Sequence, residues 1–347
     1  MASRSTRTGR GGRFWWVGLP DDELLDLRLS DLKVRVAGTE LDRRVGRLYD
    51  ELERKGLSFR PHTWLSSEWF SPDGVPGIAM PFYLAHPRLV RLEQKQMLAA
   101  EGAKEQACMK LLRHEAGHCI DTAYRLHRRK RWRALFGSFT EPYPDFYRPR
   151  PRSRDYVLHL DGWYAQAHPA EDFAETFAVW LQPGSRWRQR YRTWPALRKL
   201  AYVDELMVEI AGTPPPVRSR RQVEPVGQLK RTLGEHYRLK RMHYADDFPD
   251  FYDSDLRRIF SDEPRYVQRE TAASFLRRHR AELRRRVAAW TDAPPYTIDQ
   301  VLRDMIDRCK ELKLRLALSQ SEAQIEAVML VTVQTMYFLQ TGRRVAV

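Results

Sequence analysis

Hydrophobic residues recur at helical spacing over most of this 347-residue chain. From Asp21 to Lys55 they return every three or four positions, which is typical of helices with one buried face. The same periodicity predicts helices from about Lys104 to Arg128, from Pro169 to just before Pro183, and from Leu197 to Ile210. We therefore expect a mostly helical architecture.

The stretch from Pro61 to Pro87 departs from this pattern. It is rich in Trp, Phe, Pro and Gly, and its apolar centre runs from Ile78 to Leu84. Pro81 would break a helix but is tolerated at the edge of a sheet. The stretch therefore predicts short strands and turns, so the expected fold class is α+β, mostly helical, with a small sheet.

Three consecutive prolines, Pro214 to Pro216, mark the clearest boundary in the chain. They divide it into a basic tail at residues 1–20, expected to be disordered, a first domain at 21–212, and a C-terminal region at 217–347. The C-terminal region is highly charged, and its periodicity predicts helices. Two tetrapeptides in it fit helix capping boxes: Thr297 to Gln300 and Ser319 to Glu322.

The chain is basic, with 60 Lys and Arg against 45 Asp and Glu, a formal charge of +15. Such an excess occurs in proteins that bind nucleic acids or anionic surfaces. Here the charge is spread evenly, and the runs Arg128 to Arg131 and Arg284 to Arg286 lack the interleaved aromatic residues that stack on bases. A solvated basic surface is the simpler interpretation, and a nucleic-acid partner is not expected.

Cysteines are sparse: only Cys108, Cys119 and Cys309 occur. They form neither a disulfide framework nor the paired motifs of a structural zinc ribbon. No apolar run approaches the roughly 18 residues that a membrane span needs, and none follows the basic N-terminus as in a secretory signal. These features predict a cytoplasmic protein without a membrane span.

One pentapeptide carries recognisable chemistry: His114-Glu115-Ala116-Gly117-His118. Two histidines four residues apart on a helix project from the same face and can bind one tetrahedral zinc ion. The neighbouring Glu115 is placed to take a proton from the water on that metal. Gly117 in a helix interior costs about 1 kcal/mol relative to alanine, so we expect another element to approach closely there.

A catalytic zinc ion requires a third protein ligand and keeps its fourth position for water. The helix that begins at Pro169 offers Glu171 and Glu175, which lie one turn apart on one face. This spacing suits one metal ligand and one carboxylate that orients a ligand, and it leaves the choice between them open. Asp121, on the face of the two histidines, is another candidate for orienting a ligating ring. His168 could bind metal but fits a turn or cap better.

These motifs together resemble a known family. His114 to His118 followed by Asp121, and then Tyr164 seven residues before Glu171, is similar to a bacterial family of zinc-binding metallopeptidases. More distantly, the pattern resembles the catalytic domain of anthrax lethal factor and the Mlc titration factor peptidase. The similarity covers roughly Pro61 to Ile210.

The resemblance implies a gluzincin, a zincin-like domain in which two histidines and one glutamate hold Zn²⁺. It implies the following roles: His114, His118 and Glu171 as zinc ligands, Glu115 as general base, Tyr164 as hydrogen-bond donor to the oxyanion, and Glu175 as a partner of a ligand. It further places an edge strand for extended substrate around Ile78 to Leu84.

The sequence thus predicts a zinc-dependent metallopeptidase that hydrolyses peptide bonds in a peptide or protein substrate. The alternative is a protein that binds nucleic acid or an anionic surface and carries a non-catalytic zinc site. A structural zinc site closes with four protein ligands, usually including cysteine. Because only three nitrogen or oxygen ligands and one general base are found, the motif favours the enzyme.

Overall fold

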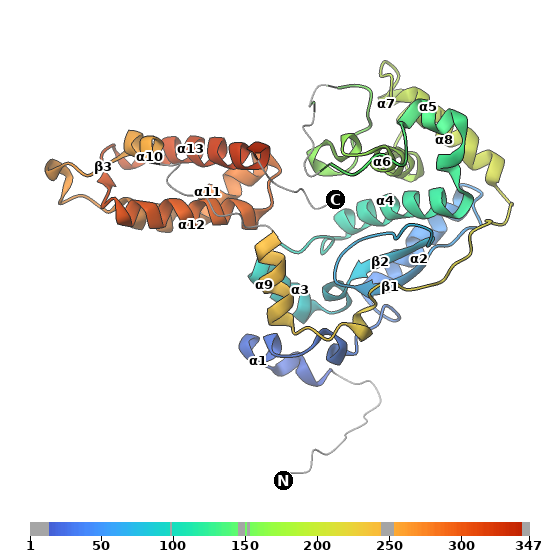
Figure 1. The fold of residues 1–347 in the computed structure, drawn as a ribbon, viewed down its shortest axis with the longest axis horizontal. Helices are drawn as coiled ribbons and strands as arrows, with labels where there is room; N and C mark the ends of the chain where they lie inside the picture. The colour runs from blue at the N-terminus through green and yellow to red at the C-terminus, as the bar shows by residue number, and fades with distance from the viewer. Residues whose placement is uncertain (1–13, 98, 145–149, 151–152, 244–252, 342–347) are drawn as a thin grey trace, which may run out of the picture.

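The computed structural model describes residues 14–97, 99–144, 150, 153–243 and 253–341. Among the described residues, two large hydrophobic cores lie along the chain, besides a small cluster of Trp64, Val75 and Ala79. The larger is built almost entirely from residues before 244, and the smaller from residues after 252. In Figure 1 the smaller core belongs to the elongated helical unit drawn in orange and red, and the larger belongs to the remaining body.

The helical segment expected from Asp21 to Lys55 is interrupted. A short helix α1 (Asp21–Leu25) is separated from α2 (Glu40–Arg54) by a 3₁₀ turn and an irregular segment. Lys33 and Gly38 in this segment adopt left-handed conformations, with φ of 51° and 76°, which cannot continue a right-handed helix. The helix α2 therefore begins anew, with the side chain of Thr39 as its cap.

The expected sheet is present and small. Strands β1 (His62–Ser66) and β2 (Gly77–Pro81) pair in parallel. On the other edge of β2, Ala79 donates to the carbonyl of Phe70 at 2.9 Å and accepts from the amide of Phe70 at 3.3 Å. Pro81 is the last residue of β2, so its missing N–H falls where the ladder ends. The α+β, mostly helical fold class is confirmed.

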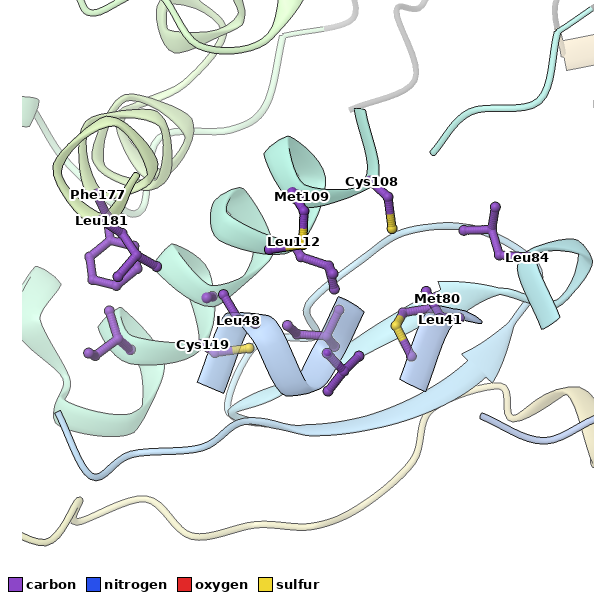
Figure 2. Packing of buried hydrophobic residues seen from close by; sticks show 14 of the residues in the cluster. Leu41, Leu48, Met80, Leu84, Cys108, Met109, Leu112, Cys119, Phe177 and Leu181 are labelled. Carbon is purple, nitrogen blue, oxygen red and sulfur yellow. The ribbon is translucent and has the colours of Figure 1, made fainter. Parts of the chain in front are cut away.

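Helix α4 (Glu105–Tyr124) occupies the centre of the larger core, between helix α6 (Pro169–Leu181) and the layer that contains the sheet and α2 (Figure 1). Both helices match the sequence expectation. In Figure 2 the side chains of Cys108, Met109 and Leu112 on α4 lie near Leu41, Leu48 and Met80, whereas Phe177 and Leu181 belong to α6. Helix α8 (Leu197–Ile210) packs against α6 and is also as expected.

The chain does not leave this core at the three prolines. After them, the amide of Val217 donates to the carbonyl of Ala123, and the carbonyl of Val223 accepts the indole N–H of Trp64 at 2.9 Å. Helix α9 (Leu233–His243) then packs against α1 and α3 (Pro87–Met97) and buries Leu233 completely. Because 217–243 makes these contacts, we propose that the first domain extends to His243 instead of ending at 212.

The smaller core is formed by α10 (Asp253–Ile259), α11 (Ala272–Thr291), α12 (Pro295–Glu311) and α13 (Gln320–Thr341), with a two-residue strand pair β3 (Phe260–Ser261) and β4 (Arg315–Leu316). The capping box at Ser319 and Glu322 is confirmed, because each amide bonds to the other side chain. The box predicted at Thr297 is wrong, since α12 already begins at Pro295. No helix of the described residues is long and apolar enough to cross a membrane.

Candidate metal centre

Helices α4 and α6 approach each other closely at Gly117. A Cβ atom built on Gly117 would lie 2.7 Å from the Cα atom of Ala174, which is shorter than any ordinary contact. The expectation that another element packs closely against this glycine is therefore confirmed. Because the helix backbones come so near, side chains on the facing surfaces of α4 and α6 can meet directly.

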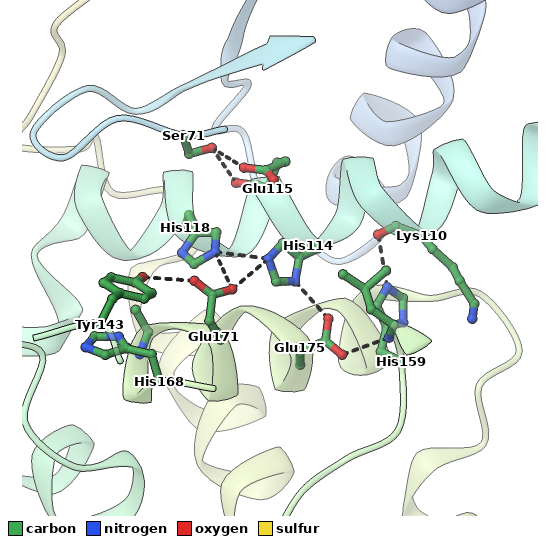
Figure 3. Close-up of polar contacts among 12 residues, drawn as sticks. Ser71, Lys110, His114, Glu115, His118, Tyr143, His159, His168, Glu171 and Glu175 are labelled. Carbon is green, nitrogen blue, oxygen red and sulfur yellow. Dashed lines mark hydrogen bonds and ion pairs between the residues drawn. The ribbon is translucent and has the colours of Figure 1, made fainter. Parts of the chain in front are cut away.

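Three side chains from these two helices converge on one point (Figure 3). The Nε2 atom of His114 lies 3.1 Å from Nε2 of His118 and 3.0 Å from Oε2 of Glu171, and the latter two atoms are 3.2 Å apart. Ligands about 2.0–2.1 Å from a tetrahedral zinc ion lie about 3.3 Å from one another. The three atoms therefore have nearly the mutual spacing that zinc requires.

Glu175 orients the ring of His114 through Nδ1, the nitrogen that does not face the other candidate ligands. This nitrogen donates to Oε1 of Glu175 at 2.8 Å, and Oε2 of the same carboxylate accepts the amide of Leu160 at 2.8 Å. Because Nδ1 is engaged by Glu175, Nε2 is the nitrogen of His114 that faces Glu171 and His118 and that can bind a metal ion. Glu175 thus lies where a carboxylate orients a metal-binding histidine.

The electrostatics of the cluster favour a positive charge at its centre. Burial by itself lowers the pKa of both imidazoles, but the neighbouring carboxylates reverse this, so the pKa of His114 lies well above its usual value and that of His118 is raised. Burial raises the pKa of Glu171, yet the two histidines outweigh it and hold that pKa well below the ordinary value. The carboxylates that stabilise a protonated imidazole here would stabilise a bound metal ion in the same way.

Glu115 lies on the side of α4 that faces Ser71, and Glu171 lies on the other side of that helix in Figure 3. The Ser71 hydroxyl donates to Oε2 of Glu115 at 2.8 Å. Ser71 directly follows Phe70, whose backbone pairs with β2, so the sheet positions the donor. Sequence reasoning did not identify Ser71, because nothing in its local pattern indicates which helix it contacts.

A cleft of about 330 Å³ opens over the cluster and contains the candidate base and ligands. Tyr164 lines it too, with its ring centroid 5.6 Å from that of His114. Several aromatic side chains complete its walls: Trp69, Phe70, Phe139 and Tyr143. The structure thus brings six of the predicted site residues to the lining of one cavity: His114, Glu115, His118, Asp121, Tyr164 and Glu171.

Tyr143 was not predicted as a site residue, since it falls in a Pro- and Arg-rich segment without periodicity. Its hydroxyl donates to Oε1 of Glu171 at 2.9 Å, and its ring stacks on His168 with centroids 3.9 Å apart. Although Tyr143 as a whole is 45% exposed, partial desolvation of its hydroxyl and the charge of Glu171 both raise the pKa of the phenol, which keeps it a proton donor. His168 caps α6 by accepting the amide of Ala170 and donates to the carbonyl of Glu141, as a capping residue would.

Some expected neighbours are not brought to the ligands. Oδ2 of Asp121 is hydrogen-bonded to Nδ1 of His127 at 2.6 Å, and among the described residues it makes no hydrogen bond with His114 or His118. Asp121 comes late in α4, where it can reach the 3₁₀ turn that follows. The expected substrate-pairing edge at Ile78 to Leu84 is also corrected, because Phe70 already pairs with that edge of β2.

Residues 93–184 match the model of a family described as "Putative zinc-binding metallo-peptidase". The matched segment contains α4 and α6 with every candidate ligand, and the expected resemblance to the zinc-binding metallopeptidase family is confirmed for it. No curated protein and no solved structure matches the chain. The more distant likeness to anthrax lethal factor and the Mlc titration factor peptidase therefore stays an expectation.

Proposed function

We propose that this protein is a zinc-dependent metallopeptidase that hydrolyses peptide bonds in the cleft above α4 and α6. The observation that carries the proposal is the convergence of the Nε2 atoms of His114 and His118 with Oε2 of Glu171, at mutual distances of 3.0–3.2 Å. The zinc-binding family that matches residues 93–184 supports the same conclusion.

The donor set fits zinc. Two imidazole nitrogens and one carboxylate oxygen are the ligands of many catalytic zinc sites, and three protein ligands leave one position for water. A zinc ion held there would act as a Lewis acid toward that water and toward the carbonyl of a bound peptide. Glu175 would keep Nε2 of His114 available as a ligand by holding the proton on Nδ1.

The remaining chemistry belongs to Glu115 and Tyr164. Glu115 accepts a proton from the attacking water and later delivers it to the leaving amine. Glu115 is only 6% exposed, and its carboxylate is held by Ser71, which limits the orientations it can adopt. Tyr164 donates a hydrogen bond to the carbonyl oxygen as negative charge develops there, a contact that is strongest in the transition state.

The alternative, a binding protein with a structural zinc site, fits the cleft less well. Structural zinc sites close with four protein ligands, usually including cysteine. Among the described residues, the group suited to a metal has three members, and the three cysteines are all buried outside it. A site with three ligands that opens into a cleft is what hydrolysis requires.

The test is to measure zinc content and hydrolysis of a peptide library by the full-length protein and its variants. We expect about one zinc per chain, lost in His114→Ala and in His118→Ala. Glu115→Gln should retain zinc yet lose hydrolysis, because it removes the base and no ligand. Hydrolysis by Glu115→Gln at the wild-type rate would refute the role of Glu115, and a wild-type protein that binds no zinc would refute the proposal itself.

A further inference from the structure

The two oxygens of the Glu171 carboxylate have different partners. Oε2 lies within 3.2 Å of the Nε2 atoms of both His114 and His118. Oε1 instead accepts the hydroxyl of Tyr143 at 2.9 Å (Figure 3). One oxygen therefore faces the candidate metal position, and the other faces a phenol donor.

Tyr143 is itself held in place by His168. The two rings stack with centroids 3.9 Å apart and planes inclined by 19°. Nε2 of His168 donates to the carbonyl of Glu141 at 2.9 Å, and Nδ1 accepts the amide of Ala170 at 3.1 Å. With both nitrogens engaged, the imidazole has one tautomer and one orientation. These contacts orient the phenol, on a residue that is 45% exposed, relative to the first turn of α6, from which Glu171 projects.

We propose that Tyr143 is a positioning residue that restricts Glu171 to binding a metal through Oε2 alone. The inference rests on the zinc site proposed above. Carboxylates bind metals through one oxygen or through both. Binding through both would occupy space in the position that a catalytic zinc keeps open for water. By engaging Oε1, the Tyr143 hydroxyl keeps the second oxygen away from that position.

Tyr143→Phe isolates this role, because phenylalanine keeps the stacked ring and removes only the donor. The freed Oε1 can then turn toward the metal. We expect turnover to fall about 10- to 100-fold, the usual effect of losing a partner of a ligating group. Zinc affinity, measured by competition with a chelator, should fall much less, since a second carboxylate oxygen compensates. If the Tyr143 hydroxyl only stabilised the local structure, its removal would lower turnover and zinc affinity together.

A direct readout is the visible spectrum of the full-length protein loaded with Co²⁺ in place of zinc. Four-coordinate cobalt absorbs more strongly than five-coordinate cobalt, so we expect weaker bands in Tyr143→Phe than in the wild type. The matched control is Tyr266→Phe, which removes the hydroxyl of a tyrosine whose ring lies against the guanidinium groups of Arg265 and Arg269, outside the cleft. Its spectrum should equal that of the wild type.

Each other outcome overturns a distinct statement. A wild-type protein that binds neither cobalt nor zinc refutes the proposed metal site, and this inference with it. If the wild type binds cobalt and hydrolyses peptides, but Tyr143→Phe has the same spectrum, only the role of Tyr143 is refuted. Loss of cobalt binding or a lowered melting temperature in Tyr143→Phe would show that the hydroxyl holds the site together and does not select the binding mode.

Discussion

The Cα atom of Ala174 in α6 lies 2.7 Å from the point where a Cβ atom on Gly117 in α4 would stand. No side chain larger than hydrogen fits there without moving one of the two helices. The candidate ligands lie on both sides of this contact, with His114 and His118 on α4 and Glu171 on α6. Because Gly117 has no side chain, α4 and α6 can come close enough for the candidate ligands of the two helices to meet.

Gly117→Ala is expected to push the two helices apart. The added methyl group should lower the free energy of unfolding by about 1–3 kcal/mol, as overpacking does, and should weaken zinc binding by moving Glu171 away from the histidines. The matched control is Gly46→Ala in α2, where nothing lies within 4 Å and alanine should stabilise by up to about 1 kcal/mol. Thermal unfolding and chelator competition measure both effects. Unchanged zinc affinity in Gly117→Ala would contradict this account of the contact.

Glu171 and Glu175 should differ in what their loss does to the metal. Glu171→Ala removes a predicted ligand and should abolish stable zinc binding. Glu175→Ala removes only the partner of Nδ1 of His114 and should weaken binding about 10- to 100-fold. Zinc titration with a fluorescent chelator distinguishes the two. If Glu175→Ala emptied the site while Glu171→Ala did not, the ligand assignment would be one helical turn out.

Tyr164→Phe should separate catalysis from metal binding. The phenol lines the cleft beside His114 but is not among the converging ligand atoms. Removal of its hydroxyl should leave the zinc content unchanged and lower kcat by roughly 100-fold or more, as for a lost oxyanion donor. Steady-state kinetics on one good peptide suffices, and a kcat within twofold of the wild type would remove Tyr164 from the proposed mechanism.

Ser71 should matter through Glu115. Ser71→Ala deletes the hydroxyl that lies 2.8 Å from Oε2 of Glu115, so the carboxylate becomes free to adopt other orientations. A hydrogen bond to a charged group contributes about 1.5–3 kcal/mol, so we expect hydrolysis to slow by roughly tenfold or more at constant zinc content. Ser321→Ala, an exposed change at the start of α13, is the control. Equal rates in the two variants would show that Glu115 needs no such support.

The ion cluster around Asp299 predicts how the smaller core responds to pH. Burial raises the pKa of this carboxyl, but the surrounding guanidinium groups outweigh it and leave the pKa below the usual value. Three arginines bind it: Arg280, Arg284 and Arg303. Because the pKa is lower in the folded state, the stability it contributes is present at neutral pH and is lost as the pH falls below about 4.

Asp299→Asn should therefore lower the free energy of unfolding by about 2 kcal/mol at pH 7, and the difference from the wild type should shrink toward pH 3. Urea unfolding of the full chain at several pH values measures it. Asp307→Asn disrupts an exposed pair with Lys310 and should cost less than about 1 kcal/mol. A deficit in Asp299→Asn that stays constant down to pH 3 would mean that the carboxylate charge is not its source.

The sequence by itself determined the two helices of the site and much of their chemistry. Periodicity located α4 and α6, and the spacing of His114 and His118 put two imidazoles on one face, because a helix turns about once in four residues. Gly117 indicated a close contact, because a glycine inside a helix lowers stability and is explained when a neighbouring element leaves no room for a side chain. These inferences depend only on local geometry, which short stretches of sequence encode.

Only the tertiary structure decided what crosses between elements. It placed Oε2 of Glu171 with the histidines and Glu175 behind His114, a choice that helical spacing left open. It also showed that Asp121 is hydrogen-bonded to His127, and that Tyr143, from a segment without periodicity, is hydrogen-bonded to Glu171. Such contacts depend on how helices and loops pack over long sequence separations. No local pattern of hydrophobic and polar residues records that packing, because the same pattern is compatible with many partners.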